Sequence, residues 1–148
     1  MKVVALLLAL CALACSRAPA PRSLMDQHKR VDEMIDVGYL AGAERQLDRM
    51  WRTDRRNNPR PSGLGRQVLQ DIAFRLGLVM LDEKKPGEAL EACTRGLALG
   101  EKDDLFTANL LILRGHIWPE MGKSLSAAED FHQALVINEK LLHEVIHP

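Results

Sequence analysis

The sequence predicts an all-α protein with one folded domain. Between residues 24 and 143, apolar side chains recur three and four positions apart, as they do along one face of an α-helix. No stretch shows the clean alternation of apolar and polar residues that a half-buried strand needs. The 148 residues are 47% hydrophobic and 27% charged, so the chain can bury a core and is not a disordered type. We therefore expect a single helical domain.

Six helices are expected, and their ends coincide with residues that favour helix termini. The periodic segments are 24–37, 41–51, 64–81, 86–99, 104–118 and 124–143. Gly38, Gly100 and Gly122 fall between segments, where a left-handed residue often ends a helix. Pro86 suits the first turn of its helix, because that position needs no backbone donor. The pattern therefore predicts helices joined by short turns.

Two parts of the chain share one spacing of small residues. In each part a glycine is followed 12, 16 and 19 residues later by small or packing residues: Gly77, Ala89, Cys93 and Gly96, then Gly115, Ala127, Phe131 and Ala134. A half-match precedes them at residues 38–50. The pattern resembles the tetratricopeptide repeat, in which small residues let paired helices approach closely. The spacings of 46 and 38 residues between Ala43, Ala89 and Ala127 depart from the 34 of that family. The alternative is an unrelated helical bundle.

The resemblance implies a short solenoid of antiparallel helix pairs with a concave binding face. In that register the first helix of each pair supplies the face, here Asp71, Phe74, Leu78, Leu81, Asn109, Ile112 and His116. Such a surface is mostly apolar and suits an amphipathic helix or apolar segment of a partner protein. The alternative is that Phe74, Leu78 and Ile112 are covered by the first helix of the chain itself.

The N-terminus predicts export from the cytoplasm. Lys2 precedes an apolar run that ends at Ala14, which matches a signal peptide over residues 1–14 and is too short to span a bilayer. Residues 12–15 resemble a bacterial lipobox, which implies a lipidated Cys15 followed by a Pro/Ala/Arg tether over residues 15–23 and a helical domain over 24–148. Ser16 favours the outer membrane, facing the periplasm, by the same resemblance. The alternative is ordinary cleavage and a secreted protein.

Charge disfavours a nucleic-acid binder, because 20 basic and 20 acidic residues balance. Five arginines nevertheless crowd residues 52–66, namely Arg52, Arg55, Arg56, Arg60 and Arg66, against Asp54. Asn57, Asn58 and Pro59 predict that this segment is a loop. Guanidinium groups bind phosphates and carboxylates with paired hydrogen bonds, so the loop would hold lipid phosphates or an acidic partner, or would simply be solvated.

One motif offers a catalytic alternative. His143, Glu144 and His147 fit the H-E-x-x-H pattern, in which two histidines bind zinc and the glutamate activates water. The helix end frays at this position, so we expect no metal and no cofactor, with incidental metal binding or a zinc-dependent hydrolase as the alternatives. Cys93 is expected to be a buried apolar residue. The sequence thus predicts a non-enzymatic envelope lipoprotein that binds or assembles proteins.

Overall fold

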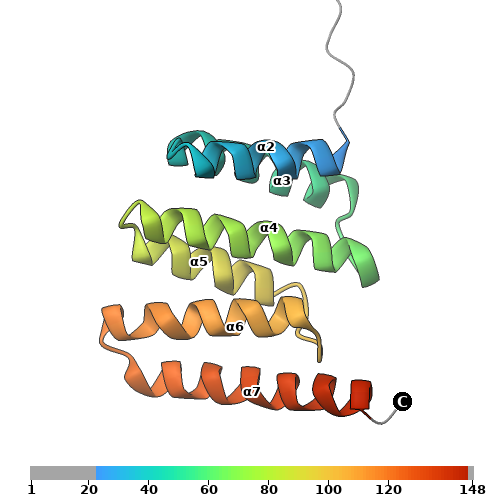
Figure 1. Cartoon of the computed structure of the whole chain (residues 1–148), viewed down its shortest axis with the longest axis vertical. Coiled ribbons are helices and arrows are strands. Elements are labelled where there is room, and N and C mark those ends of the chain that lie inside the picture. Colours follow the sequence, from blue (N-terminus) through green and yellow to red (C-terminus); the bar gives the residue numbers. More distant parts are fainter. Residues whose placement is uncertain (1–22, 147–148) are drawn as a thin grey trace, which may run out of the picture.

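The structure, a computed structural model, describes residues 23–146, apart from the side chains of the last two, and consists there of helices and turns (Figure 1). The helices are α2 (Leu24–Asp36), α3 (Leu40–Asn57), α4 (Gly63–Asp82), α5 (Pro86–Leu97), α6 (Leu105–Ile117) and α7 (Ser124–Ile146), with a short 3-10 helix, η1 (Trp118–Met121), before α7. The predicted all-α fold is confirmed. The predicted signal peptide, Cys15 and most of the tether lie outside the described residues.

The six helices form three pairs that stack along the long axis of the molecule (Figure 1). Helix α2 pairs with α3, α4 with α5, and α6 with α7, and the central pair contacts the pairs on both sides. One hydrophobic core runs through the stack from Val31 to Ile137. The apolar faces that the sequence spaces three and four residues apart therefore meet in one continuous interior.

Close helix approach depends on the small residues that the repeat spacing singled out. A Cβ atom on Gly77 would lie 3.2 Å from the Sγ atom of Cys93, and one on Gly115 would lie 2.7 Å from the ring of Phe131. Both contacts join residues 16 positions apart in consecutive helices of one pair. In the second and third pairs, the equivalent glycine thus lets the second helix pack closely against the first.

The prediction of a loop over residues 52–66 is wrong except at residues 58–62. Helix α3 continues to Asn57 and α4 begins at Gly63, so only residues 58–62 connect them. Arginine is a good helix former, and the breaking signals Pro59 and Pro61 act only beyond the last turn. Arg55 also donates a hydrogen bond of 2.9 Å to the carbonyl oxygen of Pro59, which stabilises the helix end. The longer repeat spacing comes from long helices and not from a basic loop.

The predicted glycine turns are confirmed, with φ angles of 72° at Gly38, 112° at Gly100 and 72° at Gly122. Pro86 lies in the first turn of α5, as expected. Pro119 lies in the 3-10 helix that ends α6 and redirects the chain into α7. Within residues 23–146, no helix has the length and apolar character needed to cross a membrane.

Candidate protein-binding surface

The predicted groove residues of α4 and α6 divide into buried and accessible groups. Phe74, Leu81 and Ile112 are half-buried and pack against the core. Leu78 is 41% exposed, and Asn109 and His116 are also exposed. Because α4 contacts α6 directly, these side chains belong to adjoining helices of the stack. The groove is therefore shallower and less apolar than the sequence alone suggested.

Asp71, the acidic member of the predicted groove, is held by neighbouring side chains. Its Oδ2 atom lies 2.9 Å from Nε of Arg75 and 3.6 Å from Nδ1 of His28. Arg75 also bridges to Asp32 at 2.5 Å, so these contacts join α4 to α2. Burial lowers the pKa of His28, although the nearby Asp71 carboxylate partly opposes this effect. The first helix thus meets α4 through charged groups here and leaves Leu78 accessible.

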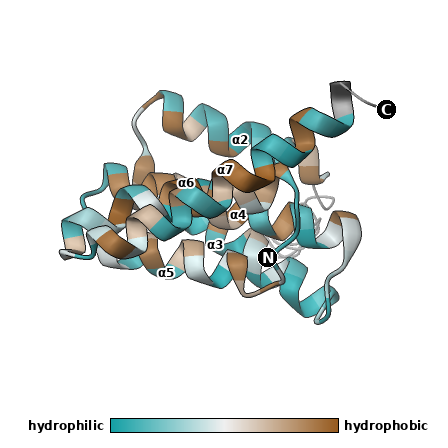
Figure 2. Ribbon diagram, turned by 90° about the horizontal axis from the view of Figure 1, so that it is seen from below, coloured by the Kyte–Doolittle hydropathy of each residue, from teal (hydrophilic) through white to brown (hydrophobic). Residues whose placement is uncertain are grey.

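The sequence analysis missed an exposed apolar face on α7. Phe131, Leu135 and Leu142 are 37%, 55% and 60% exposed and lie on one side of the helix. The ring of Phe131 lies 5.1 Å from that of His116 in an edge-on arrangement, so this side adjoins the groove residues of α6. In Figure 2, brown segments of α7 are visible at this end of the stack. We call Ile112, His116, Phe131, Leu135 and Leu142 the α6–α7 apolar surface.

The signal for this surface was present in the sequence. Helix α7 carries one apolar series that is buried, comprising Ala127, Ala134, Ile137 and the half-buried Leu141. A second series, at positions 131, 135 and 142, is offset from the first by about a quarter turn. A helix with two apolar sides either lies between two neighbours or leaves one side open.

A buried ion pair fixes the orientation of α7 against α6. Asp130 is 5% exposed and accepts two hydrogen bonds of 2.7 Å from Arg114, one at each carboxylate oxygen. It also accepts one of 2.9 Å from the indole nitrogen of Trp118. These hydrogen bonds and the Asp130 charge raise the pKa of Arg114. The α6–α7 apolar surface is therefore presented by a rigid helix pair.

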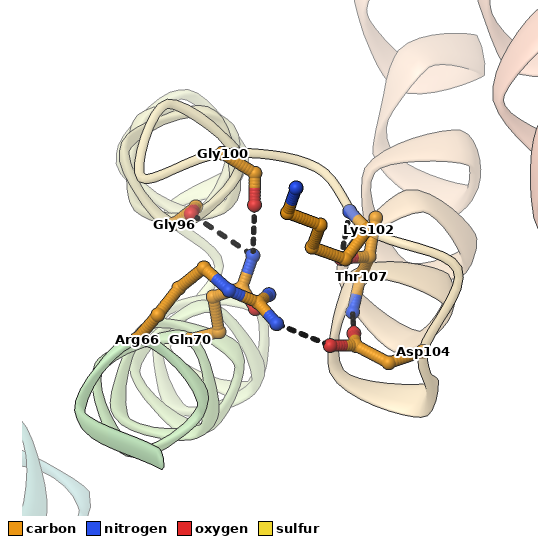
Figure 3. A network of polar contacts seen from close by, with 7 residues as sticks. All are labelled: Arg66, Gln70, Gly96, Gly100, Lys102, Asp104 and Thr107. Carbon is orange, nitrogen blue, oxygen red and sulfur yellow. Dashed lines mark hydrogen bonds and ion pairs between the residues drawn. The ribbon is translucent and has the colours of Figure 1, made fainter. Parts of the chain in front are cut away.

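Arg66, predicted as part of a basic loop, is a buried structural residue instead (Figure 3). It is 7% exposed and donates to the side chains of Gln70, at 2.5 Å, and of Asp104. Gln70 in turn donates to the carbonyl oxygens of Gly96 and Gly100, at 3.4 Å each. The partner acid lies 38 residues away in sequence, which is why local composition did not reveal this pairing.

Asp104 connects the same network to the start of α6. Its Oδ1 atom accepts a hydrogen bond of 3.0 Å from the backbone N–H of Thr107, and the hydroxyl oxygen of Thr107 accepts one of 3.1 Å from the N–H of Lys102. Burial opposes ionisation of Asp104, but the hydrogen bonds and charge of Arg66 and the Thr107 N–H bring its pKa below the usual value. The network joins the second and third helix pairs.

The other four predicted arginines lie outside this network. Arg52, Arg55 and Arg56 belong to the last turns of α3, and Arg60 lies in the connection to α4. Arg52 pairs with Asp48 at 2.7 Å and keeps 73% of its side chain exposed. Three of these four basic side chains therefore belong to the end of helix α3 and not to a loop.

The proposed metal ligands give no site within the part of the chain that the structure describes. His143 and Glu144 lie exposed in the last turns of α7, whereas His147 lies outside the described residues. In residues 23–146, no three His, Cys, Asp or Glu side chains are grouped closely enough to hold a metal ion. Cys93 is fully buried, and burial raises the pKa of its thiol to about 12, as suits a packed core residue.

Comparison of this chain with protein-family models, with curated proteins and with solved structures finds no match.

Proposed function

We propose that this protein is a tetratricopeptide-like lipoprotein of the bacterial envelope that binds a partner protein and catalyses no reaction. Cys15 carries the lipid, the outer membrane holds the anchor, and the helical domain faces the periplasm. The partner contributes an amphipathic helix that lies on the α6–α7 apolar surface. The protein thereby acts as an assembly or scaffold module.

The observation that carries this proposal is the accessibility of the α6–α7 apolar surface. Three large side chains on one side of α7 are between 37% and 60% exposed, and they continue onto His116 of α6. Burying such side chains against a partner releases about 25 cal/mol for each Å² of apolar area. An amphipathic helix offers apolar residues at the matching spacing of three and four.

Charge around the surface favours a partner helix with basic edges. Residues 105–146 carry three basic side chains and five acidic ones. Asp130, one of the five, is neutralised by Arg114, whereas Glu129, Glu139 and Glu144 remain exposed on α7. Of these, Glu139 lies next to the apolar stripe of α7, so a lysine or arginine beside the apolar stripe of the partner would meet its carboxylate at the rim, where charge steers association.

The repeated packing positions support the tetratricopeptide resemblance. Gly77 and Gly115 are each covered by the residue 16 positions later, in the second helix of the same pair. Ala43, Ala89 and Ala127, which share one register, are 0%, 0% and 4% exposed. Repeats of this kind commonly hold partner helices on a surface made by stacked pairs.

The test is chemical crosslinking and affinity purification from envelopes of a bacterium that produces the full chain. We compare the parent with a Leu135→Asp/Leu142→Asp variant and with a Val37→Asp control, since Val37 is 79% exposed in the turn at the opposite end of the stack. The expected result is one recurring protein partner that the double variant loses and the control retains. Equal recovery with all three proteins would refute the proposed surface, and recovery of the chain crosslinked only to itself would replace the partner by a second copy.

Two further measurements test the remaining parts of the proposal. Metabolic labelling with a palmitate analogue should mark the parent and leave a Cys15→Ala variant unmarked, and an unlabelled parent would end the lipoprotein proposal. Metal analysis of the purified protein should give less than one zinc per chain. Stoichiometric zinc that a His143→Ala variant loses would favour the hydrolase instead.

A further inference from the structure

Helix α3 carries a continuous ridge of arginines on its outer side. Arg45, Arg49, Arg52 and Arg56 follow each other at intervals of four, three and four residues, and all four are exposed. These intervals place them along one line of the helix, opposite the core residue Leu47, over a length of roughly 16 Å. We call these four residues the α3 arginine ridge.

The acids near the ridge gather around Arg52, which shares a depression with Glu44, Glu88 and Glu91. Asp48 pairs with Arg52, and the hydroxyl oxygen of Tyr39 accepts a hydrogen bond from Arg45. Among the described residues, Arg49 and Arg56 have neither a hydrogen-bond nor an ion-pair partner. The ridge also borders a shallow depression of about 350 Å³, lined by Asp48 and Thr53 with the four arginines. Several guanidinium donors therefore point to solvent along one line.

The remainder of the stack has the opposite charge. From residue 63 to residue 146 there are nine basic and thirteen acidic side chains. Residues 23–62 carry eight basic and seven acidic side chains, so the positive charge of the first pair is concentrated on the α3 arginine ridge, and an anionic surface would approach from the side of that ridge. Membrane phosphates fit this geometry, because arginine forks bind phosphate oxygens in pairs and an extended ridge matches a flat array of headgroups.

The position of the ridge relative to the N-terminal tether favours a bilayer as the anionic surface. Helices α2 and α3 are antiparallel, and Gln46 of α3 donates a hydrogen bond of 3.5 Å to Gln27 of α2. Leu24, where α2 begins, therefore lies at the same end of the pair as Arg56 (Figure 1). A lipid on Cys15 would keep this end of the domain within about 30 Å of the membrane, since only eight residues separate Cys15 from α2 and that is the length they would span at full extension.

We propose that the α3 arginine ridge binds the phosphate groups of anionic phospholipids and lays the first helix pair against the membrane. The α6–α7 apolar surface, at the other end of the stack, then lies away from the bilayer, where a partner can reach it. The choice of a bilayer as the ligand rests on the proposed location in the envelope. Because the α3 arginine ridge and the α6–α7 apolar surface share no residue, the experiments can refute the lipid proposal and the partner proposal separately.

The test measures binding of the full chain, carrying Cys15→Ala, to phosphatidylglycerol vesicles and to phosphatidylcholine vesicles by co-sedimentation. The ratio of the two affinities reports the effect of headgroup charge, and comparison between variants isolates the ridge, because residues 1–14 with Lys2 are the same in all of them. The test variant carries Gln at Arg45, Arg49, Arg52 and Arg56. The matched control carries Gln at Lys84, Lys102, Lys123 and Lys140, which removes the same charge from other parts of the stack.

The parent and the lysine control should prefer phosphatidylglycerol, and the arginine variant should lose about 100-fold of that preference at low salt. The difference should shrink at about 0.5 M salt, because screening shortens the range of the interaction. Circular dichroism should give the same melting temperature for the parent and the arginine variant, since the ridge is exposed. Equal binding of the parent to both vesicle types, or an equal loss in both variants, would overturn the proposal and favour an acidic protein as the ligand.

Discussion

The first and third helix pairs both pack against the central pair, yet they differ in how they are held and in what they expose. Helix α2 buries one side chain, Val31, whereas α6 buries seven residues. Helix α2 meets α4 through the Arg75–Asp32 ion pair and the His28–Asp71 contact, which are partly open to solvent, while α3 packs its buried side chains against α4. The third pair is joined to α4 by the buried side chain of Arg66. Helix α2 is thus held more loosely than α6, whereas α3 packs firmly against the central pair.

The two pairs also differ in the chemistry of the side chains that they expose. The first pair presents the α3 arginine ridge, and the third pair presents the α6–α7 apolar surface. An apolar docking site needs a rigid support, because its residues must keep the spacing that a partner helix matches. Electrostatic contact with a membrane tolerates movement better. The third pair, with its buried Arg66 and Asp130 contacts, is therefore a suitable support for protein recognition.

The largest expected loss of stability comes from breaking the buried ion pair of the third helix pair, and breaking an exposed ion pair should cost much less. Asp130→Ala should lower the free energy of unfolding by about 3–5 kcal/mol, because Arg114 would stay buried without its carboxylate partner. Asp103→Ala removes only the exposed pair with Lys140 and should cost less than about 1 kcal/mol. Urea denaturation followed by circular dichroism measures both values. Similar losses would mean that α7 is not fixed by the Asp130 contacts.

The second prediction compares close packing in the centre of the stack with that at its end. Gly96→Ala should cost about 2 kcal/mol, because its new methyl group would lie 2.8 Å from both Ala73 and Leu110 in the core. Gly115→Ala should cost less, since its methyl group meets the ring of Phe131, which is 37% exposed and can turn away. Thermal melting of the two variants gives the order, and a larger loss for Gly115→Ala would contradict it.

The third prediction concerns the looser attachment of helix α2. Asp32→Ala removes an ion pair whose two side chains are 53% and 29% exposed, and it should cost about 0.5 kcal/mol. Amide hydrogen exchange should nevertheless speed up in α2 and stay unchanged in α6. If α6 exchanges faster than α2 in the parent protein, the order of attachment described above is wrong.

The smallest effect is a pH dependence at the contact between α2 and α4. The pKa of His28 lies below its ordinary value because the side chain is buried, with Arg75 adding to this shift and Asp71 and Asp32 opposing it. The unfolded chain therefore takes up the proton first, so the stability present above about pH 6.5 is lost as pH falls through the pKa of the folded state.

Between about pH 7.5 and pH 5.5, His28→Gln should lose less stability than the parent, as urea denaturation at each pH would show. His132→Gln serves as the control, because His132 is exposed on α7 and should follow the parent. Parallel pH profiles for the parent and the His28 variant would exclude this contribution.

The helices and their turns followed from the sequence because their signals are local. Apolar spacing placed all six helices, and the glycines at positions 38, 100 and 122 marked turns that do have positive φ. The loop prediction failed because arginine content and two asparagines were taken as signs of irregular structure, although the helix ends only when the prolines approach.

The candidate surfaces were harder to predict, since they depend on which face a neighbour covers. Of the seven groove residues expected from the register, Leu78, Asn109 and His116 are exposed in the structure. The register did not show that Asp71 is held by Arg75 and His28, or that Arg66 finds Asp104 across 38 residues. Phe131, Leu135 and the α3 arginine ridge were visible as spacings, but only the packed structure shows that those sides of α7 and α3 are open.

The most direct test of the two-ended account is photo-crosslinking in living cells from one position at each end. A photoreactive phenylalanine derivative replaces Leu135 in one full-length protein and Arg49 in another, both of which are exposed. The account predicts a discrete protein adduct from position 135 and none from position 49, where lipid is the neighbour. A discrete protein adduct from position 49, with none from position 135, would contradict it.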